Sequence, residues 1–342
     1  MHRVSFKDGF LRLGIAFFAF GAGAANAADR VSIGLIGSIS DAPFFVAQAK
    51  GYFAEEGIEL ETSKFDSAAR MIAPMGSGDL EVGAGAVSAG LYNAIERGIK
   101  IKIVADKARN SPGNSYSAIM VRKALVDEGK VKSFADFKGL KVAAAGPGIA
   151  DLSTINQALK AGGLKYSDIE IVYLGMPQHS AAFLNGAIDA ALDAEPFATG
   201  VVRQGGAVKF ATIASFYPNQ QTSVVLFSEK FLKNQAVATR FLRAYLKGCR
   251  YYNTGLADGK YSGERGDEIV NILAKYSNVN DPAFLRSISP SAVDANGQVD
   301  MNSLRTDLDF FVAQGWVKDP NLLSEAVDTS IISKLASEMA AK

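Results

Sequence analysis

Apolar and polar positions follow a pattern that occurs twice along the chain, about 110 residues apart. The first copy opens with an apolar strand at 31–36, followed by a glycine-containing loop and a helix that ends at Lys50-Gly51. The second opens with a strand at 141–145 and a helix that ends at Gly162-Gly163. Glycine adopts the left-handed conformation that terminates helices. The pattern therefore predicts one strand–helix unit in each half.

The two copies continue to match. Short strands at 58–61 and 169–173 precede helices at 68–75 and 178–185, then strands at 79–82 and 189–192, helices at 89–97 and 196–204, and strands at 101–105 and 208–213. Strands that alternate with helices indicate mostly parallel sheets covered on both faces. We predict an α/β fold with two lobes of the same topology, each a mostly parallel sheet flanked by helices.

The rest of the chain completes this division. Apolar segments at 117–122 and 223–227 flank the second copy and are predicted to cross between lobes, and the helical pattern after about Ser228 is assigned to lobe one. The predicted limits are 28–116 and 223–342 for lobe one and 117–222 for lobe two. Ligands bind outside the carboxyl ends of such strands, so the facing lobes would enclose one cleft that closure buries.

The first 27 residues have the three regions that are typical of a secretory signal peptide. Basic residues precede an apolar run from Leu13 to Phe20 and the small-residue site Ala25-Asn26-Ala27, which predicts cleavage before Ala28 and a periplasmic location. The apolar run is shorter than the ~20 residues that a membrane-spanning helix needs. No cysteine follows the predicted cleavage site, so a lipid anchor is not expected.

Charge and cysteine content narrow the function classes. The 36 basic and 35 acidic residues form no basic stripe, which argues against nucleic acid or an anionic membrane as partner. Cys249 is the single cysteine, so no internal disulfide is expected, and its four-residue spacing from Tyr245 favours a buried helix face over an intermolecular thiol. We expect a monomer without metal or cofactor.

Loops at equivalent positions of the two copies are the candidate ligand contacts. The segment 146–154 can present backbone N–H groups to an anion, or can be a simple turn; it lacks the ending of a phosphate loop. Segment 37–43 is its counterpart. Small residues at 83–88 leave room for a ligand, and Ser88 suits a helix N-cap. The candidate residues are Ser38, Ser40, Asp41, Phe44, Ser67, Ala86, Ser88, Arg109, Tyr116, Gly148, Asp151, Ser153, Thr154, Glu195 and Tyr217.

Three of the charged candidates carry alternatives. Arg109 is expected either to clamp a ligand anion or to pair with an acid of lobe two. Glu195 precedes a proline-initiated helix, where a carboxylate complements the helix dipole. His179 is interpreted as a solvent-facing or capping residue, with a ligand contact as the alternative, and no catalytic role is expected because no Ser-His-Asp arrangement can be completed around it.

The segment Ala42-Pro43-Phe44-Phe45-Val46-Ala47-Gln48-Ala49-Lys50-Gly51-Tyr52-Phe53 resembles the opening helix of periplasmic binding proteins for nitrate, sulfonates and thiamine pyrimidine precursors. Segments 134–142, 189–197 and 314–317 resemble the same family. The resemblance implies a type II two-lobed fold, an ABC permease and ATPase as partners, and a role for Glu195 in accepting hydrogen bonds from ligand N–H groups. It also implies a small organic ligand. The lack of a cysteine cluster separates this chain from pyrimidine synthases of the same fold.

Capture of a small organic molecule, with an anionic ligand as one option, and its delivery to an ABC permease is therefore the leading hypothesis. An enzyme on the same fold, such as a synthase or lyase, is the alternative, and a sensory domain is a third. Arg109 and Glu195 together would suit a ligand with one group of each charge, and Glu195 would repel a bare anion such as nitrate.

Overall fold

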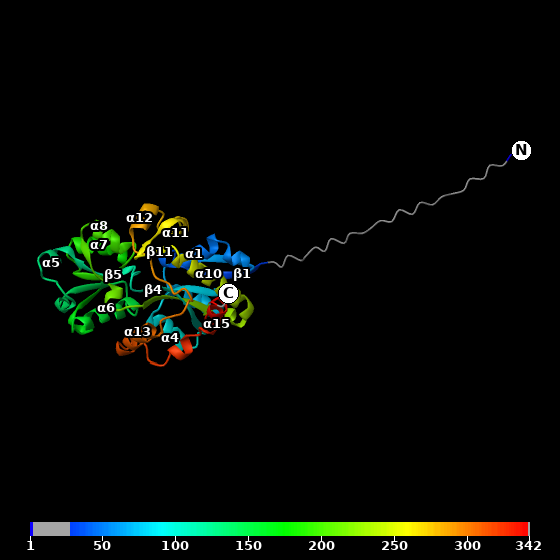
Figure 1. The fold of residues 1–342 in the computed structure, drawn as a ribbon. Coiled ribbons are helices and arrows are strands. Elements are labelled where there is room, and N and C mark those ends of the chain that lie inside the picture. Colours follow the sequence, from blue (N-terminus) through cyan, green and yellow to red (C-terminus); the bar gives the residue numbers. More distant parts are fainter. Residues whose placement is uncertain (3–27, 341–342) are drawn as a thin grey trace.

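Two five-stranded sheets flanked by helices form the two halves of the molecule (Figure 1). The computed structural model describes residues 1–2 and 28–340. The predicted signal peptide therefore lies almost wholly outside the described residues. None of the helices within the described ranges is both long and apolar enough to cross a membrane.

The two sheets have the same strand order. The first runs β2-β1-β3-β10-β4 and the second β7-β6-β8-β5-β9. Their bounds are β1 Asp29–Leu35, β2 Ile58–Lys64, β3 Val82–Ala86, β4 Ile101–Asn110 and β10 Gln220–Ser228, and β5 Ser117–Arg122, β6 Lys141–Ala144, β7 Glu170–Tyr173, β8 Ala190–Ala194 and β9 Ala207–Thr212. The predicted α/β fold with two lobes of one topology is confirmed.

The apolar segments 117–122 and 223–227 are not crossings, which corrects the sequence interpretation. They form β5 and most of β10, and each pairs antiparallel with a strand on both sides. The chain passes between the sheets just before them, at 111–116 and 213–219. A strand buried on both faces gives an unbroken apolar run, so the sequence alone did not distinguish it from a crossing. The predicted lobe limits stay a prediction.

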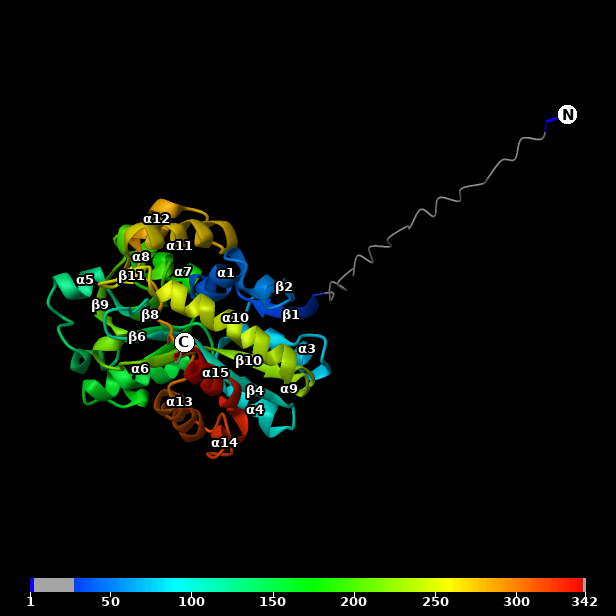
Figure 2. The same ribbon diagram turned by 45° about the vertical axis from the view of Figure 1, so that its right-hand side comes forward.

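Helices cover both sheets (Figure 2). The helices of the first half are α1 Ala42–Ala49, α2 Tyr52–Glu55, α3 Ile72–Ser77 and α4 Ala89–Glu96. Those of the second half are α5 Lys123–Asp127, α6 Ala150–Ala161, α7 Met176–Leu184 and α8 Phe197–Arg203. The C-terminal part adds α9 Glu229–Lys233, α10 Gln235–Asn253, the hairpin β11 Leu256–Ala257 and β12 Lys260–Tyr261, α11 Gly263–Tyr276, α12 Pro282–Ser287, α13 Met301–Ala313, α14 Leu323–Ala326 and α15 Ser330–Ala340.

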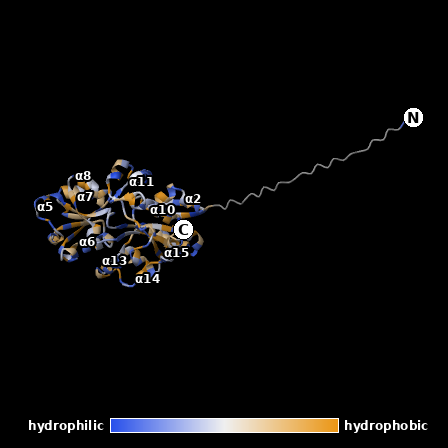
Figure 3. Cartoon of the chain, in the orientation of Figure 1, coloured by the Kyte–Doolittle hydropathy of each residue, from blue (hydrophilic) through white to orange (hydrophobic). Residues whose placement is uncertain are grey.

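The largest core lies where α10 packs on α1. Phe44 stacks on Tyr245 with ring centroids 4.4 Å apart, and Cys249 is fully buried one turn further along α10, as predicted. Hydrophobic and hydrophilic residues alternate along the helices (Figure 3), and the buried residues of α10 are mainly apolar or aromatic, as at Phe241, Leu242 and Leu246. On the other side of the molecule α13 packs against α6, so the C-terminal part contacts both halves.

Three strands differ from their predicted bounds by three residues or more. β2 continues to Lys64 instead of stopping at Glu61, and β3 spans Val82–Ala86 instead of 79–82, so the small residues expected in a loop after it lie in the strand. β4 continues to Asn110 instead of stopping at Ala105. The extension places Asp106, Lys107 and Arg109 inside a strand, where they were expected in a loop. This difference changes the interpretation of all three side chains.

Candidate functional site

Three neighbouring strands of the second sheet end at one edge. In the order β7-β6-β8, His179 lies in the first turns of the helix after β7, Asp151 opens the helix after β6, and Asp193 lies near the end of β8. Because these strands are parallel, their carboxyl ends bring the three side chains together. This edge is the usual ligand position in open α/β sheets.

His179 and Asp193 form a fully buried pair. The distance between His179 Nδ1 and Asp193 Oδ1 is 2.5 Å, and Nε2 donates to the carbonyl oxygen of Leu174 at 2.9 Å. A carbonyl only accepts, so Nε2 carries a hydrogen, and Nδ1 and the carboxylate share a second one. The pair therefore has no net charge. Its burial contradicts the expectation that His179 faces solvent or caps the helix.

Burial and hydrogen bonding act in opposite directions on this histidine. Burial lowers the pKa of His179, but the hydrogen bond that Nδ1 donates to Asp193, the charge of that carboxylate and the Leu174 carbonyl outweigh burial and raise the pKa above the ordinary 6.5. Burial also raises the pKa of Asp193, against the effect of His179. Both directions favour retention of the shared proton.

Asp151 lies beside this pair without a bond of its own. Its side chain is partly exposed, and within residues 28–340 we find no hydrogen bond or ion pair to its carboxylate. Burial raises its pKa to about 6, Asp193 adds to the shift and His179 opposes it. Among the charged candidates, Asp151 is the one without a bonded partner in residues 28–340.

The facing loop of the first sheet is fixed by a lysine that sequence reasoning missed. Lys107 Nζ lies 2.7 Å from Asp41 Oδ1, with both side chains at most 1% exposed, and donates to Ser40 Oγ at 2.9 Å. Asp41 Oδ2 accepts from the backbone N–H groups of Gly37 and Ser38 at 2.7 and 3.0 Å. If the sequence analysis had extended this strand to Asn110, the presence of a lysine at a buried strand position would have indicated this role for Lys107.

The two halves contact each other where the start of α4 meets the loop after β6. The Ala89 N–H donates to the Gly148 carbonyl oxygen at 2.8 Å, and Ser88 and Ile149 form a β-bridge. Ser88 Oγ accepts from the Leu91 N–H at 3.2 Å, which confirms the predicted N-cap. Ala86 and Ser67, also predicted, remain exposed.

Glu195 is occupied by its own lobe. Its carboxylate is 1% exposed, accepts from Lys209 Nζ at 2.5 Å and Thr199 Oγ1 at 2.8 Å, and also accepts from the Thr199 N–H at 3.1 Å. The last contact lies in the first turn of α8, as the helix-dipole alternative requires. The peptide bond between Glu195 and Pro196 is cis.

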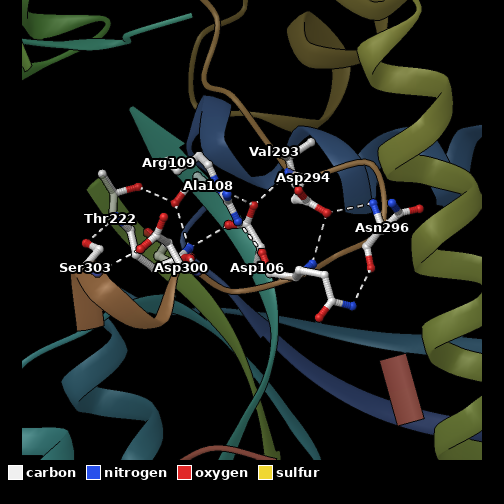
Figure 4. Close-up of polar contacts among 12 residues, drawn as sticks. Asp106, Ala108, Arg109, Thr222, Val293, Asp294, Asn296, Asp300 and Ser303 are labelled. Atoms are coloured by element: carbon white, nitrogen blue, oxygen red, sulfur yellow. Dashed lines mark hydrogen bonds and ion pairs between the residues drawn. The ribbon is translucent and has the colours of Figure 1, made fainter. Parts of the chain in front are cut away.

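Arg109 forms bonds within its own lobe, which contradicts the expected pairing with an acid of lobe two. Its Nε donates to Asp106 Oδ2 at 2.9 Å and its Nη2 to the carbonyl oxygen of Gln298 (Figure 4). Asp106 also accepts from Gln221 and from the Asp294 N–H. The guanidinium therefore neutralises a buried acid of its own strand.

Other candidates are also engaged in packing or internal bonds. Phe44 belongs to the α1–α10 core, so it is withdrawn from the site. Tyr217 donates toward Ser303 and Asp307, and Tyr116 donates to Thr222 at 2.8 Å. Thr154 Oγ1 donates to the Ala150 carbonyl and accepts from Gln220. Ser153 is buried, and its Oγ has no hydrogen-bond partner among the described residues.

The family model described as NMT1/THI5-like matches residues 39–254. The chain belongs to this family. The taurine-binding periplasmic protein of Escherichia coli (strain K12) is 30% identical over 193 residues, which cover 56% of this chain and 55% of that protein. A 4-amino-5-hydroxymethyl-2-methylpyrimidine phosphate synthase of Aspergillus parasiticus is 28% identical over 159 residues, or 45% of this chain and 42% of the synthase.

These matches thus span about half the length of the curated relatives, or less. The fold extends further than the sequence identity. The periplasmic aliphatic sulphonate binding protein SsuA from Escherichia coli superposes with a TM-score of 0.69 at 18% identity, covering 88% of this chain and 92% of that one. The resemblance stated from sequence segments is confirmed at the level of family and fold.

Proposed function

We propose that this protein is an extracytoplasmic solute-binding protein that captures a small organic molecule between its lobes and delivers it to an ABC permease and ATPase. The observation that carries the proposal is the meeting of strand-end loops from two sheets of one topology, with Asp151 two residues after the contact at Ile149. Support also comes from the periplasmic binding proteins among its relatives. The proposed location is the periplasm, and the proposed state is a monomer.

The proposed ligand contacts come from both lobes. Ser38, Ser88 and the exposed Ser67 and Ala86 would contribute from lobe one, and Gly148, Asp151 and Ser153 from lobe two. Buried Ser40 and Asp41 with Lys107, and Glu195 with Lys209, would support these loops from behind. Asp193 joins the set because its Oδ2 is buried without a partner among the described residues.

The synthase among the relatives makes an enzyme the alternative function. The geometry around His179 favours the binding role. A general base needs a free lone pair. Both nitrogens of His179 are engaged, with Asp193 and the Leu174 carbonyl, so neither offers one to a substrate. We propose that the protein binds its ligand without chemical change.

A screen of small metabolites against purified residues 28–342 tests this function. A ligand at 100 times its dissociation constant should stabilise the fold by about 2.7 kcal/mol, which raises the melting temperature. Calorimetry should then give one site per chain, and mass spectrometry should recover the ligand unaltered. Product formation, or no binding by any compound, would contradict the proposal.

A further inference from the structure

The charges at the edge of the second sheet do not balance. Within the described residues, Glu195 is paired with Lys209, and His179 shares its proton with Asp193, so each pair is neutral. On the facing loop Asp41 is paired with Lys107. Asp151 has no such partner, and its neighbours include two further acids, Asp193 and Asp307. One negative charge therefore remains uncompensated here.

The acceptors at this edge also exceed the donors. Oδ1 of Asp193 faces the histidine, but Oδ2 is buried and has no hydrogen-bond partner in the part of the chain that the structure describes. The Asp193 side chain is 0% exposed, and it lies close enough to Asp151 to raise the pKa of that carboxyl. Buried acceptors are nearly always bonded in folded proteins. A ligand group with N–H donors would satisfy this acceptor.

These groups also decide against an anion at the start of α6. A helix N-terminus attracts anions because its first N–H groups are unpaired and its dipole is positive there. Asp151, at the second position of this helix, already supplies a carboxylate to that end. A sulfonate placed beside it would meet an unscreened like charge in a partly desolvated position.

We propose that the ligand carries a singly charged organic cation, an ammonium or amidinium group with N–H donors, and that this group binds between the Asp151 carboxylate and Asp193 Oδ2. The inference rests on the proposed binding function and names the class of ligand. His179 is a positioning residue in this arrangement, because it holds Oδ1 of Asp193 and so directs Oδ2. The cation supplies both the missing charge and the missing donors.

The proposed site at Asp151 and Asp193 predicts a specific pH dependence of ligand affinity. Burial raises the pKa of Asp151 to about 6, so the carboxylate forms as the pH rises from 5 to 7 and affinity for a cation should increase by up to about tenfold per unit below pH 6. The other groups that face it change little there. Burial raises the pKa of Asp307 to about 8 and that of Tyr116 beyond the ordinary range, and His179 with Asp193 retains its proton. Affinity for an anion would fall instead.

Matched pairs of probes, one with and one without the cation, test the inference in the presence of EDTA. Suitable pairs are taurine and ethanesulfonate, and benzamidine and benzamide, followed by thermal shift and calorimetry at pH 5.5 and 7. We expect cationic members to bind, and Asp151→Asn to weaken them at least tenfold. The control Asp127→Asn, at an acid that is 56% exposed on the same lobe, should leave affinity unchanged.

Two outcomes would overturn the inference and leave the binding function standing. The first is a sulfonate or other compound of a broader library that binds while no cationic member does. The second is unchanged affinity of Asp151→Asn for a cationic member that binds the native protein. If no small molecule of either set binds, the inference and the proposed function both fail.

Discussion

His179 shows how much a single contact changes the meaning of a residue. From sequence it is one histidine near the start of a helix, two residues after Pro177. In the structure it is 0% exposed and bonded through both nitrogens. Nothing in the local sequence pattern pairs it with Asp193, because His179 lies in α7 and Asp193 in β8, and the contact depends on the order of the strands in the sheet.

Replacement of His179 by alanine should destabilise the protein by about 3–5 kcal/mol, because Asp193 would be left as an uncompensated buried charge. Urea unfolding at pH 7 measures the effect. The exposed neighbour Gln178→Ala should change the free energy of unfolding by less than about 0.5 kcal/mol. The double variant with Asp193→Ala should lose less than the sum of the single losses, since no charge remains buried. Additive losses would show that the pair does not interact.

At the scale of elements, the length of β4 decides the role of Arg109. β4 is five residues longer than expected, so Arg109 lies in a strand and not in a loop. There it faces Asp106 and the 294–300 segment. Burial raises the pKa of Asp106 to about 6, although Arg109 opposes the shift. The carboxylate thus depends on this guanidinium at neutral pH.

Arg109→Ala should therefore lower stability by about 3 kcal/mol and leave the affinity of the folded protein within about twofold. The loss arises because Asp106 keeps its burial but not its cation. Chemical unfolding and calorimetry with the ligand separate the two quantities. Arg97→Ala, at an exposed position after α4, is the matched control for loss of an arginine. A large affinity loss with normal stability would restore the ligand-clamp role.

Glycines within helices give a second test at this scale. A Cβ on Gly248 of α10 would lie 2.3 Å from the Pro43 carbonyl oxygen and 2.8 Å from Ala47 Cβ, because α1 and α10 pack closely. Gly248→Ala should cost more than the ~1 kcal/mol that alanine gains in helix propensity, so the melting temperature should fall. Gly200→Ala in α8, where nothing lies within 4 Å of the new Cβ, should raise it. Equal shifts in both variants would mean that α1 moves aside freely.

The repeat, the helices and the fold class could be predicted because their signals are local. Apolar periodicity and helix-ending glycines at Gly51 and Gly163 record the strand–helix units directly. The position of β5 and β10 as paired strands inside their sheets could not be predicted this way, since strand pairing joins residues far apart in sequence. The site was partly predicted: Asp151 and Gly148 lie at the contact, but Lys107 and Asp193 were missed and Phe44 belongs to the core.

At the scale of the whole molecule, the two halves are joined by two connections and by contacts between their facing loops. The segments 111–116 and 213–219 pass between the sheets. The Ala89–Gly148 hydrogen bond and the Gln220–Thr154 bond hold the loops together without a charge. Contacts of this kind are weak individually, so we expect the closed arrangement to depend on the ligand.

Ala89→Pro should test that dependence with little effect on the fold of either lobe. Ala89 is the first residue of α4, a position where proline suits a helix, and Ser88 has the extended backbone that precedes proline. The substitution removes the N–H group that donates to the Gly148 carbonyl oxygen and puts the proline ring in its place. Loss of this hydrogen bond and the bulk of the ring both favour separated lobes. We expect a larger radius of gyration by X-ray scattering and about tenfold weaker ligand binding, with unchanged secondary structure. Met301→Pro, at the exposed first position of α13, is the matched control. Identical scattering and affinity in both variants would show that this contact has no part in closure.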